Sequence, residues 1–526
     1  MNIYFLGMCV SFAIYLIISF FVSKKVKTTN DFFVAGRNAP LILIVGSMIA
    51  SYVSTGMFMG DAGEYYSGLF SPMTILATMQ VVGYIYGAVF FGRYLRRSEV
   101  LTIPDFFGKR FCSEKVRVLS IVISIITMTV YLLSVMQGIG TLMNVVTGID
   151  YNLCIVIALV VFVLVSILSG ASGVLITDTL MFAVFTLSLI IAAFVIVKKG
   201  GGLTEVVNTL MNNSEKKGLL TWDGNTDYLY NSGLKNCFWG IIYGVVWLSV
   251  CMVGPWQSSR YLMAKNEHVV VRSSLFSALG IFLLQLLAGI ASVAVNVFNP
   301  NLENASHVLL WASKNVLPTA LGVVLLTGVL AAGISSATTF LSLIGSSVSN
   351  DIFKGKGKSI AISRVSMIAV SVVVLLLAIT NPPQIRIILY FGGSIVAASW
   401  LPVAVASIIS KRVTREATFW GMLIGFVGCF VMKLLPSLLK ISLPLICDPT
   451  VVGILLNVIT LIVVSLFTSV SEEEKSARDK LFVIPESEKK PEDVAKTKKY
   501  LIATILLGVF VTVVLLLVWA IPVVRA

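Results

Sequence analysis

Small and hydroxyl-bearing residues interrupt two of the apolar stretches of this chain. The stretch 46–60 holds three glycines and four serine or threonine hydroxyls. In the stretch 331–340, Ser335, Thr338 and Thr339 are spaced i, i+3 and i+4, which places their hydroxyls on one helical face. Neutral oxygens gathered in this way can coordinate a hard cation that must bind and then leave. The alternatives are helix packing through small residues and hydroxyls that bond back to their own helix.

Two apolar stretches also contain features that break a helix. Gly56 lies among the small residues of the first, and the step Gly254-Pro255 interrupts the stretch 236–260. Proline lacks the N–H that a continuous helix needs, so the hydrogen-bond ladder cannot pass through this step intact. Irregular backbone inside a bilayer is tolerated only where it faces protein, water or an ion. We therefore predict two unwound segments that line a binding site at mid-depth.

Asp178 is the carboxylate that we place clearly inside an apolar segment. A carboxylate at that depth costs several kcal/mol unless it is paired or solvated, so a functional role is expected. Cation coordination and proton relay both remain open. Arg93 and Arg260 follow apolar stretches, and we expect them to anchor helix ends at the membrane surface.

Motifs for enzymatic chemistry are missing from the sequence. The segment 355–359 lacks the first glycine of a phosphate-binding loop, and neither an HExxH nor a GxSxG pattern occurs. His268 and His307 are expected at the surface. We predict that the protein is not an enzyme, has no transition-metal site and needs no cofactor.

The composition places all these residues in an integral membrane protein. The chain has 526 residues, of which 57% are hydrophobic and 12% charged, and its mean hydropathy is +0.95. These values exclude a water-soluble enzyme. Segments of about 20 apolar residues predict an all-α protein with about fourteen spans. The predicted spans are 3–23, 41–66, 70–95, 118–147, 151–169, 172–198, 236–260, 270–297, 318–345, 360–380, 386–410, 416–436, 450–470 and 500–522.

The net charge of +14 marks one side of the membrane and not a nucleic-acid partner. With fourteen spans and the N-terminus outside, most of the 39 Lys and Arg residues fall in inside loops. We therefore predict a multi-pass protein of the plasma (inner) membrane with both termini outside. The stretch 471–499, rich in both signs of charge, is expected to be a solvated cytoplasmic linker.

The two predicted breaks lie in spans 2 and 7, which are five spans apart. Because five is odd, a repeat of five helices must run in the opposite direction the second time, as in many secondary transporters. The predicted organisation is a 5+5 inverted repeat with additional helices at both ends. Its parts are 1–40 (first helix and cytoplasmic loop), 41–198 (first repeat), 199–235 (extracellular loop), 236–411 (second repeat), 412–470 (two further helices), 471–499 (linker) and 500–526 (final helix).

Several motifs, in order along residues 1–470, resemble the sodium:solute symporter family, whose members include proline, pantothenate, sialic acid and sugar transporters. The hallmark before the second span is matched by the segment 31–37, Asp-Phe-Phe-Val-Ala-Gly-Arg. Further matches are residues 50–60, Thr177-Asp178, Gly254-Pro255 with Arg260-Tyr261-Leu262, Ala331-Ala332 with Ser335-Ser336, and Asn350-Asp351-Ile352-Phe353. The resemblance implies a LeuT-type fold.

The resemblance also implies two sodium sites. By position, the first would use the backbone carbonyls of Ala50, Val53 and Ala332 with the hydroxyls of Ser335 and Ser336. The second would use oxygens of Asp178, Ser335, Thr338 and Thr339. All of these positions carry suitable oxygens in this sequence.

The positions that face solute in the family correspond to Tyr52, Ser54, Met57, Gln80, Tyr131 and Trp247. The polar ligands of the sugar transporters are not reproduced at 52 and 57. Position 52 also lacks the aspartate of the proline transporters, and position 131 lacks an arginine for a sialic acid carboxylate. The segment 381–385 with Phe391-Gly392-Gly393 is most similar to the pantothenate and amino-acid branches. Each aromatic residue has ordinary helix packing as its alternative role.

The resemblance implies a sodium-coupled symporter that imports a small organic solute by alternating access, such as an organic anion or an amino-acid-like zwitterion. The expected partners are therefore the solute, Na+ as coupling ion, and the lipid bilayer. The alternatives are a proton-coupled symporter that uses Asp178 and a transport-derived solute sensor.

Overall fold

The computed structural model describes residues 3–24, 28–353, 359–380 and 385–521, and these are 83% helical without strands. Within them, thirteen helices are long and apolar enough to cross a membrane, and a bent pair brings the number to as many as fourteen. The prediction of an all-α membrane protein with about fourteen spans is confirmed. The main helices are α1 (Ile3–Ser23), α2 (Thr29–Val34), α3 (Leu41–Tyr52), α4 (Ala62–Tyr66), α5 (Phe70–Gly87), α6 (Arg93–Arg97), α7 (Ile103–Arg110), α8 (Glu114–Thr147), α9 (Tyr151–Lys199), α10 (Leu203–Met211), α11 (Gly233–Val253), α12 (Pro255–Met263), α13 (Glu267–Ala294), α14 (Val308–Asn315), α15 (Thr319–Ser347), α16 (Ser359–Thr380), α17 (Ile385–Ser399), α18 (Leu401–Ile409), α19 (Arg415–Leu439), α20 (Pro449–Phe467), α21 (Glu472–Lys480) and α22 (Pro491–Leu515).

Two of the predicted spans are joined in the single long helix α9. Gly170 adopts φ 53° and ψ −162° and divides it into spans Tyr151–Leu168 and Gly170–Lys199. A side chain at Gly170 would be strained by this positive φ and would press on the ring of Phe32, 2.6 Å from an added Cβ. The chain therefore reverses direction with almost no connecting loop.

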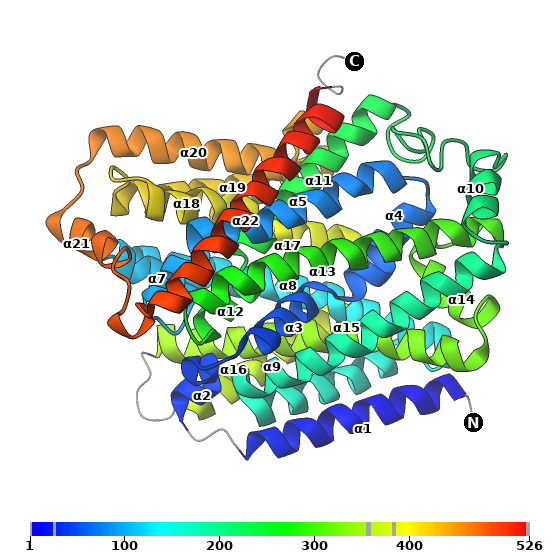
Figure 1. Cartoon of the computed structure of the whole chain (residues 1–526), viewed down its shortest axis with the longest axis horizontal. Coiled ribbons are helices and arrows are strands. Elements are labelled where there is room, and N and C mark those ends of the chain that lie inside the picture. The colour runs from blue at the N-terminus through cyan, green and yellow to red at the C-terminus, as the bar shows by residue number, and fades with distance from the viewer. Residues whose placement is uncertain (1–2, 25–27, 354–358, 381–384, 522–526) are drawn as a thin grey trace.

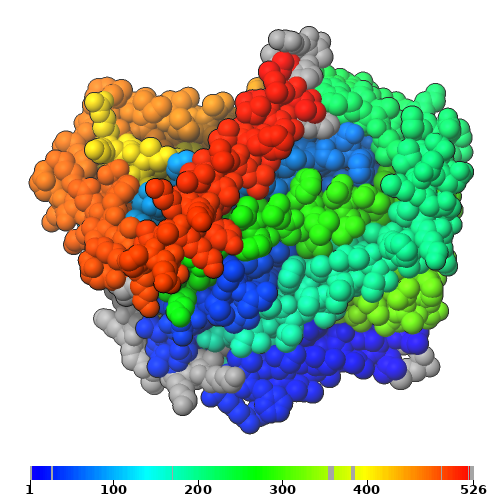
Figure 2. Space-filling view, viewed as in Figure 1, coloured from blue at the N-terminus to red at the C-terminus, as the bar shows by residue number. Residues whose placement is uncertain are grey.

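The long helices lie side by side in one bundle (Figure 1). The elements that carry the interrupted helices pack against their neighbours in the bundle, where α3 contacts α9, α12, α13 and α15. α1 lies along one flank against α9 and α15. α22 crosses the opposite flank diagonally and contacts α5 and α13, as the space-filling view also shows (Figure 2).

The charged stretch 471–499 remains largely exposed, but part of it is helical and packs against the helix ends beside it. It contains α21, whose Glu474 is 1% exposed and accepts a hydrogen bond from the backbone N–H of Arg415 at 2.7 Å. Arg110 donates to the backbone carbonyl of Glu474 at 3.2 Å and to that of Ser407 at 2.7 Å. Burial lowers the pKa of Arg110 to about 10. The acidic residues of this stretch therefore hold it against the basic helix ends beside it.

His268 is buried and not at the surface as predicted. Its two ring nitrogens lie 2.6 Å from Thr497 Oγ1 and 3.0 Å from the carbonyl oxygen of Glu488. Sequence position next to a loop gave no signal of this burial, because the covering residues come from more than 200 positions away. His268 thus ties the start of α13 to the last helix.

Candidate functional site

The second span is broken where the small residues predicted it. α3 ends at Tyr52, Val53 is extended with ψ 118°, and a π-helical turn resumes at Gly56. The two halves, Leu41–Tyr52 and Gly56–Tyr66, are bent by 52°. Neighbouring helices approach closely here because they also present glycine: an added Cβ at Gly138 would lie 2.4 Å from Thr55 Oγ1.

The seventh span is also broken at its predicted position. Gly254 is extended, with φ −56° and ψ 138°, and separates α11 from α12. Pro255 opens α12 at a position where a helix tolerates a missing N–H. Equivalent spans of the two repeats are therefore both interrupted, which leaves backbone polar groups free of the helical ladder at the centre of the bundle.

Five oxygens gather where α15 passes the first break. The Ser335 hydroxyl donates to the carbonyl oxygens of Ala50 at 2.7 Å and Ala332 at 2.9 Å. The Ser336 hydroxyl lies 3.3 Å from the carbonyl oxygen of Val53. All five residues are fully buried. These are the oxygens of the first predicted sodium site, and the structure brings them together as neutral ligands suited to a hard cation.

An arginine side chain contacts the second predicted set of oxygens. Arg260 Nη2 lies 2.8 Å from Asp178 Oδ2 and 2.7 Å from Thr339 Oγ1. Arg260 Nε donates to Ser47 Oγ at 2.9 Å, and that hydroxyl donates to Asp178 Oδ2 at 2.6 Å. Thr338 Oγ1 instead bonds its own helix, 3.1 Å from the carbonyl of Ser335.

The expectation that Arg260 anchors a helix end is therefore wrong. Its side chain is 1% exposed, and the carboxylate that it pairs with is fully buried. The predicted span 236–260 ended at this residue. In the structure a new helix starts after the break at Gly254 and continues past Arg260 to Met263. A basic residue on the half-helix that follows a break is the signal that could have placed Arg260 in the core.

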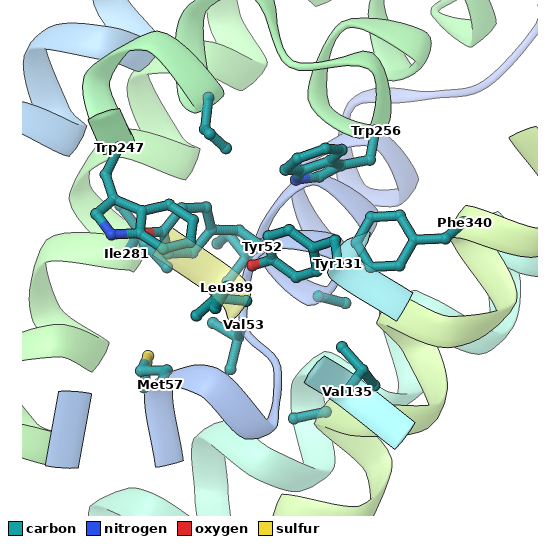
Figure 3. Close-up of a cluster of buried hydrophobic side chains, with 14 of the residues drawn as sticks. Tyr52, Val53, Met57, Tyr131, Val135, Trp247, Trp256, Ile281, Phe340 and Leu389 are labelled. Atoms are coloured by element: carbon teal, nitrogen blue, oxygen red, sulfur yellow. The ribbon is translucent and has the colours of Figure 1, made fainter. Parts of the chain in front are cut away.

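Aromatic rings gather beside Tyr52 and Val53 at the first break (Figure 3). The ring of Tyr131 packs 6.2 Å from that of Trp247, 4.8 Å from that of Trp256 and 4.7 Å from that of Phe340. The rings of Tyr52 and Trp247 meet edge to face at 5.4 Å. We call these five side chains the aromatic chamber. Trp256 and Phe340 were not among the predicted solute-binding residues.

The other predicted solute-binding residues lie beside the aromatic chamber. Gln80 is buried, and its side-chain amide donates to the hydroxyl of Tyr52. Met57 is buried next to the break, where Figure 3 places it below Tyr52. Ser54 accepts a hydrogen bond from the backbone N–H of Gly56 at 3.1 Å and so shapes the unwound turn. The segment 381–384, used in comparing family branches, lies outside the described residues.

Two further carboxylates lie on the second half of the broken helix, which the sequence analysis did not single out. Asp61 is 3% exposed, and its Oδ1 and Oδ2 accept hydrogen bonds from Tyr243 at 3.1 Å and Gln285 at 2.8 Å. Glu64 is 2% exposed and pairs with Arg386 at 2.7 Å. Both lay within the predicted second span, and their positions inside an apolar segment were the available signal.

Comparison with known proteins places this arrangement in one family. The model of the sodium:solute symporter family matches residues 32–425. The chain belongs to the sodium:solute symporter family. Its membership shows a membrane transporter and not an enzyme, as predicted.

Several characterised proteins are similar to this symporter-family chain over most of its length. The sodium/proline symporter of Salmonella typhimurium is 24% identical, with 81% of this chain and 88% of that protein covered. Sodium/glucose cotransporter 1 of Ovis aries is 26% identical, with 76% and 66% covered. The family resemblance inferred from the motifs is confirmed.

Solved structures agree on the fold. A Na+-coupled sialic acid symporter in a substrate-bound outward-open state matches with a TM-score of 0.74 at 15% identity, and covers 89% of this chain and 98% of that one. Mhp1, a nucleobase-cation-symport-1 family transporter in a closed conformation, matches with a TM-score of 0.60 at 11% identity, and covers 86% and 99%. The LeuT-type inverted-repeat fold is therefore shown.

Proposed function

We propose that the protein imports a small organic solute by sodium-coupled symport with alternating access. The observation that carries the proposal is the cluster of five buried oxygens at Ala50, Val53, Ala332, Ser335 and Ser336. A sodium ion there would replace the hydroxyl-to-carbonyl bonds with ion-to-oxygen contacts. It would thereby join the break in the first repeat to α15 in the second.

This position of the ion explains how sodium and solute affect each other. Val53 supplies a carbonyl to the ion cluster, and the adjacent Tyr52 belongs to the aromatic chamber. An ion that fixes the conformation of Val53 therefore also fixes the ring beside the solute. The coupling is a shared free energy, typically 1–3 kcal/mol, so the solute must raise sodium affinity by the factor by which sodium raises solute affinity.

The second predicted sodium site requires a movement of Arg260. The guanidinium bonds two of the four predicted ligands, Asp178 and Thr339, and supplies a positive charge of its own. We propose that a sodium ion binds to this set only in a conformation in which the arginine has left it. In the conformation described here, the proposed sodium ion binds at one place, the cluster of oxygens at Ser335.

The same ion pair weighs against proton coupling through Asp178. A buried carboxylate that faces a guanidinium at 2.8 Å is stabilised in its charged form and does not need a proton.

The solute is proposed to lie against Tyr52, Ser54, Met57, Gln80, Tyr131 and Trp247. Proline, glucose and sialic acid, which are named for the similar proteins, are less favoured, because the ligands expected for them at positions 52, 57 and 131 are not reproduced.

The test is solute uptake by the purified protein in proteoliposomes. An inward sodium gradient should drive accumulation, and an equal potassium gradient should not. Uptake driven by a pH gradient without sodium would contradict the proposal in favour of proton coupling. Binding without net uptake under either gradient would instead indicate a solute sensor.

A further inference from the structure

Asp61 is a buried carboxylate without a basic partner. Within the described residues, no Lys, Arg or His nitrogen lies within ion-pair distance of it, and Arg386 pairs with Glu64 instead. Its hydrogen-bond donors, Tyr243 from α11 and Gln285 from α13, are neutral. Arg386 acts on Asp61 only from a distance, and neutral donors offset only part of the cost of removing a charge from water, so the site favours a positive charge in direct contact with Asp61.

Asp61 stands next to the aromatic chamber. Met57 and Ile281 both border the chamber in Figure 3, and Asp61 and Gln285 follow them by four residues, about one helical turn, on the same two segments. Tyr243, which bonds Asp61, packs its ring 6.1 Å from that of Trp247. A solute lying against Trp247 can therefore reach this carboxylate.

Unsatisfied polar atoms beside Asp61 indicate what kind of group would fit. Gln285 donates its amide N–H to Asp61, while its own Oε1 is buried and has no hydrogen-bond partner. Gln80 likewise has a buried, unpartnered Oε1 at the other end of the chamber. A carboxylate also has more acceptor sites than the two in use at Asp61. The free positions on Asp61, Gln285 and Gln80 are thus acceptors, which a ligand group with several N–H donors would satisfy, while the indole Nε1 atoms of Trp247 and Trp256 in the chamber are free donors.

The rings beside Asp61 shape the site through their edges. Tyr243 stacks on Tyr390 at 5.3 Å and on Trp239 at 5.0 Å, so its ring packs on other rings and its hydroxyl is the part that meets Asp61. A quaternary ammonium has no N–H and would leave the acceptor of Gln285 unpaired, whereas a protonated primary or secondary amine can donate to both Gln285 and Asp61.

We propose that Asp61, Gln285 and Tyr243 bind the protonated amine of the transported solute, which is therefore an amine or an amine-bearing zwitterion and not a simple anion. The inference rests on the proposed symport function and names its substrate class. The amine would donate to the free positions of Asp61 and to Oε1 of Gln285. The rest of the solute would lie against the aromatic chamber.

Matched pairs of small molecules test this assignment on the purified full chain. Each pair differs only by an amino group in place of a hydroxyl: L-alanine and L-lactate, 4-aminobutyrate and 4-hydroxybutyrate, 4-amino-1-butanol and 1,4-butanediol, ethanolamine and ethylene glycol. The measurement is the rise in unfolding temperature with sodium and with potassium, since a ligand of the native state stabilises it. At least one amine should raise the unfolding temperature in sodium while its hydroxyl partner does not. A panel in which no amine outperforms its partner would overturn the assignment.

The variants Asp61→Asn and Glu64→Gln localise the effect. Both remove one buried carboxylate from the same helix, but only Asp61 lacks a cation in the structure. Asp61→Asn should weaken binding of the amine by at least about 30-fold, as expected when one partner of a buried charge pair is removed, and Glu64→Gln should keep the preference for the amine. A preference that survives Asp61→Asn would refute the role of this residue. If Asp61→Asn fails to fold, Gln285→Leu, which removes the amide but keeps the bulk, should weaken binding of the amine more than that of its hydroxyl partner.

Two other occupants of the site give different results. If Asp61→Asn abolishes the response to sodium alone, the carboxylate is an ion ligand; if it abolishes only a pH dependence of binding, it is a proton site. Either result overturns the amine assignment and leaves sodium symport standing. If sodium stabilises nothing in the wild-type chain while an amine still binds, the proposed function fails and the amine site remains.

Discussion

Arg260 Nη2 lies 2.8 Å from Asp178 Oδ2 and so joins α12 to α9. Both side chains are buried, and the Ser47 hydroxyl bonds the same carboxylate oxygen from α3. Three helices, α3, α9 and α12, therefore meet at one ion pair. Any movement that separates these helices at this level must first break it or carry it along.

Replacing Arg260 by glutamine should destabilise the protein strongly. The change leaves Asp178 charged and buried without its partner, which typically costs 3–5 kcal/mol. The free energy of unfolding in detergent, compared by a double-mutant cycle with Asp178→Asn, measures the coupling. The double variant should be more stable than Arg260→Gln alone. Strict additivity of the two single changes would show that the pair contributes no coupling energy.

Replacing Ser335 by alanine should weaken sodium binding by about tenfold or more, since one of five oxygens that a hard cation needs is lost. Ser346→Ala is the matched control, because Ser346 lies on the same helix but bonds only its own backbone, at 2.7 Å from the carbonyl of Ser342. Sodium titrations followed by unfolding temperature compare the two. Equal sodium affinity in both variants would remove Ser335 from the site.

A methyl group at Gly138 should disturb the break of the second span. An added Cβ would lie 2.4 Å from Thr55 Oγ1, whereas at Gly392 the nearest atom would be 3.6 Å away, an ordinary contact. Gly138→Ala is expected to cost about 1–3 kcal/mol of stability through overpacking, and Gly392→Ala much less. Unfolding free energies compare the two variants. Transport by Gly138→Ala at the wild-type rate would mean that Thr55 can shift without cost to the break.

Lys216 gives the loop between α10 and α11 a pH dependence. Its Nζ donates to Asn296 Oδ1 at 2.8 Å and to the carbonyl of Tyr66 at 3.2 Å, and burial lowers its pKa to about 8. Between pH 8 and about 10.5, the ordinary pKa of lysine, the unfolded chain holds more protons at this residue than the folded chain, so stability rises with pH in that window. Wild-type protein should therefore gain stability relative to Lys216→Met from pH 8 to 10. A difference that stays constant over this range would contradict the lowered pKa.

The sequence predicted most of the fold because its signals are local. Length and apolarity located the spans, and Gly56 and Gly254-Pro255 located both breaks. Helical spacing grouped Ser335 with Thr338 and Thr339, whereas the meeting of Ser335 and Ser336 with Ala50 and Val53 was expected from the family resemblance. The pairing of Arg260 was missed, since the depth of a residue cannot be counted along a helix that breaks and restarts. The hydrogen bonds of Asp61 were missed for a different reason: its partners Tyr243 and Gln285 come from distant helices.

The last helix has a consequence for how the protein is made. Tyr86 on α5 and Thr512 on α22 lie 3.1 Å apart, hydroxyl to hydroxyl, although 426 positions separate them in the chain. During synthesis α5 enters the membrane early and its outer face meets lipid until α22 emerges from the ribosome. α5 therefore reaches its final surroundings only after α22 has been translated, and a chain that ends before α22 leaves one of its early helices with an uncovered face.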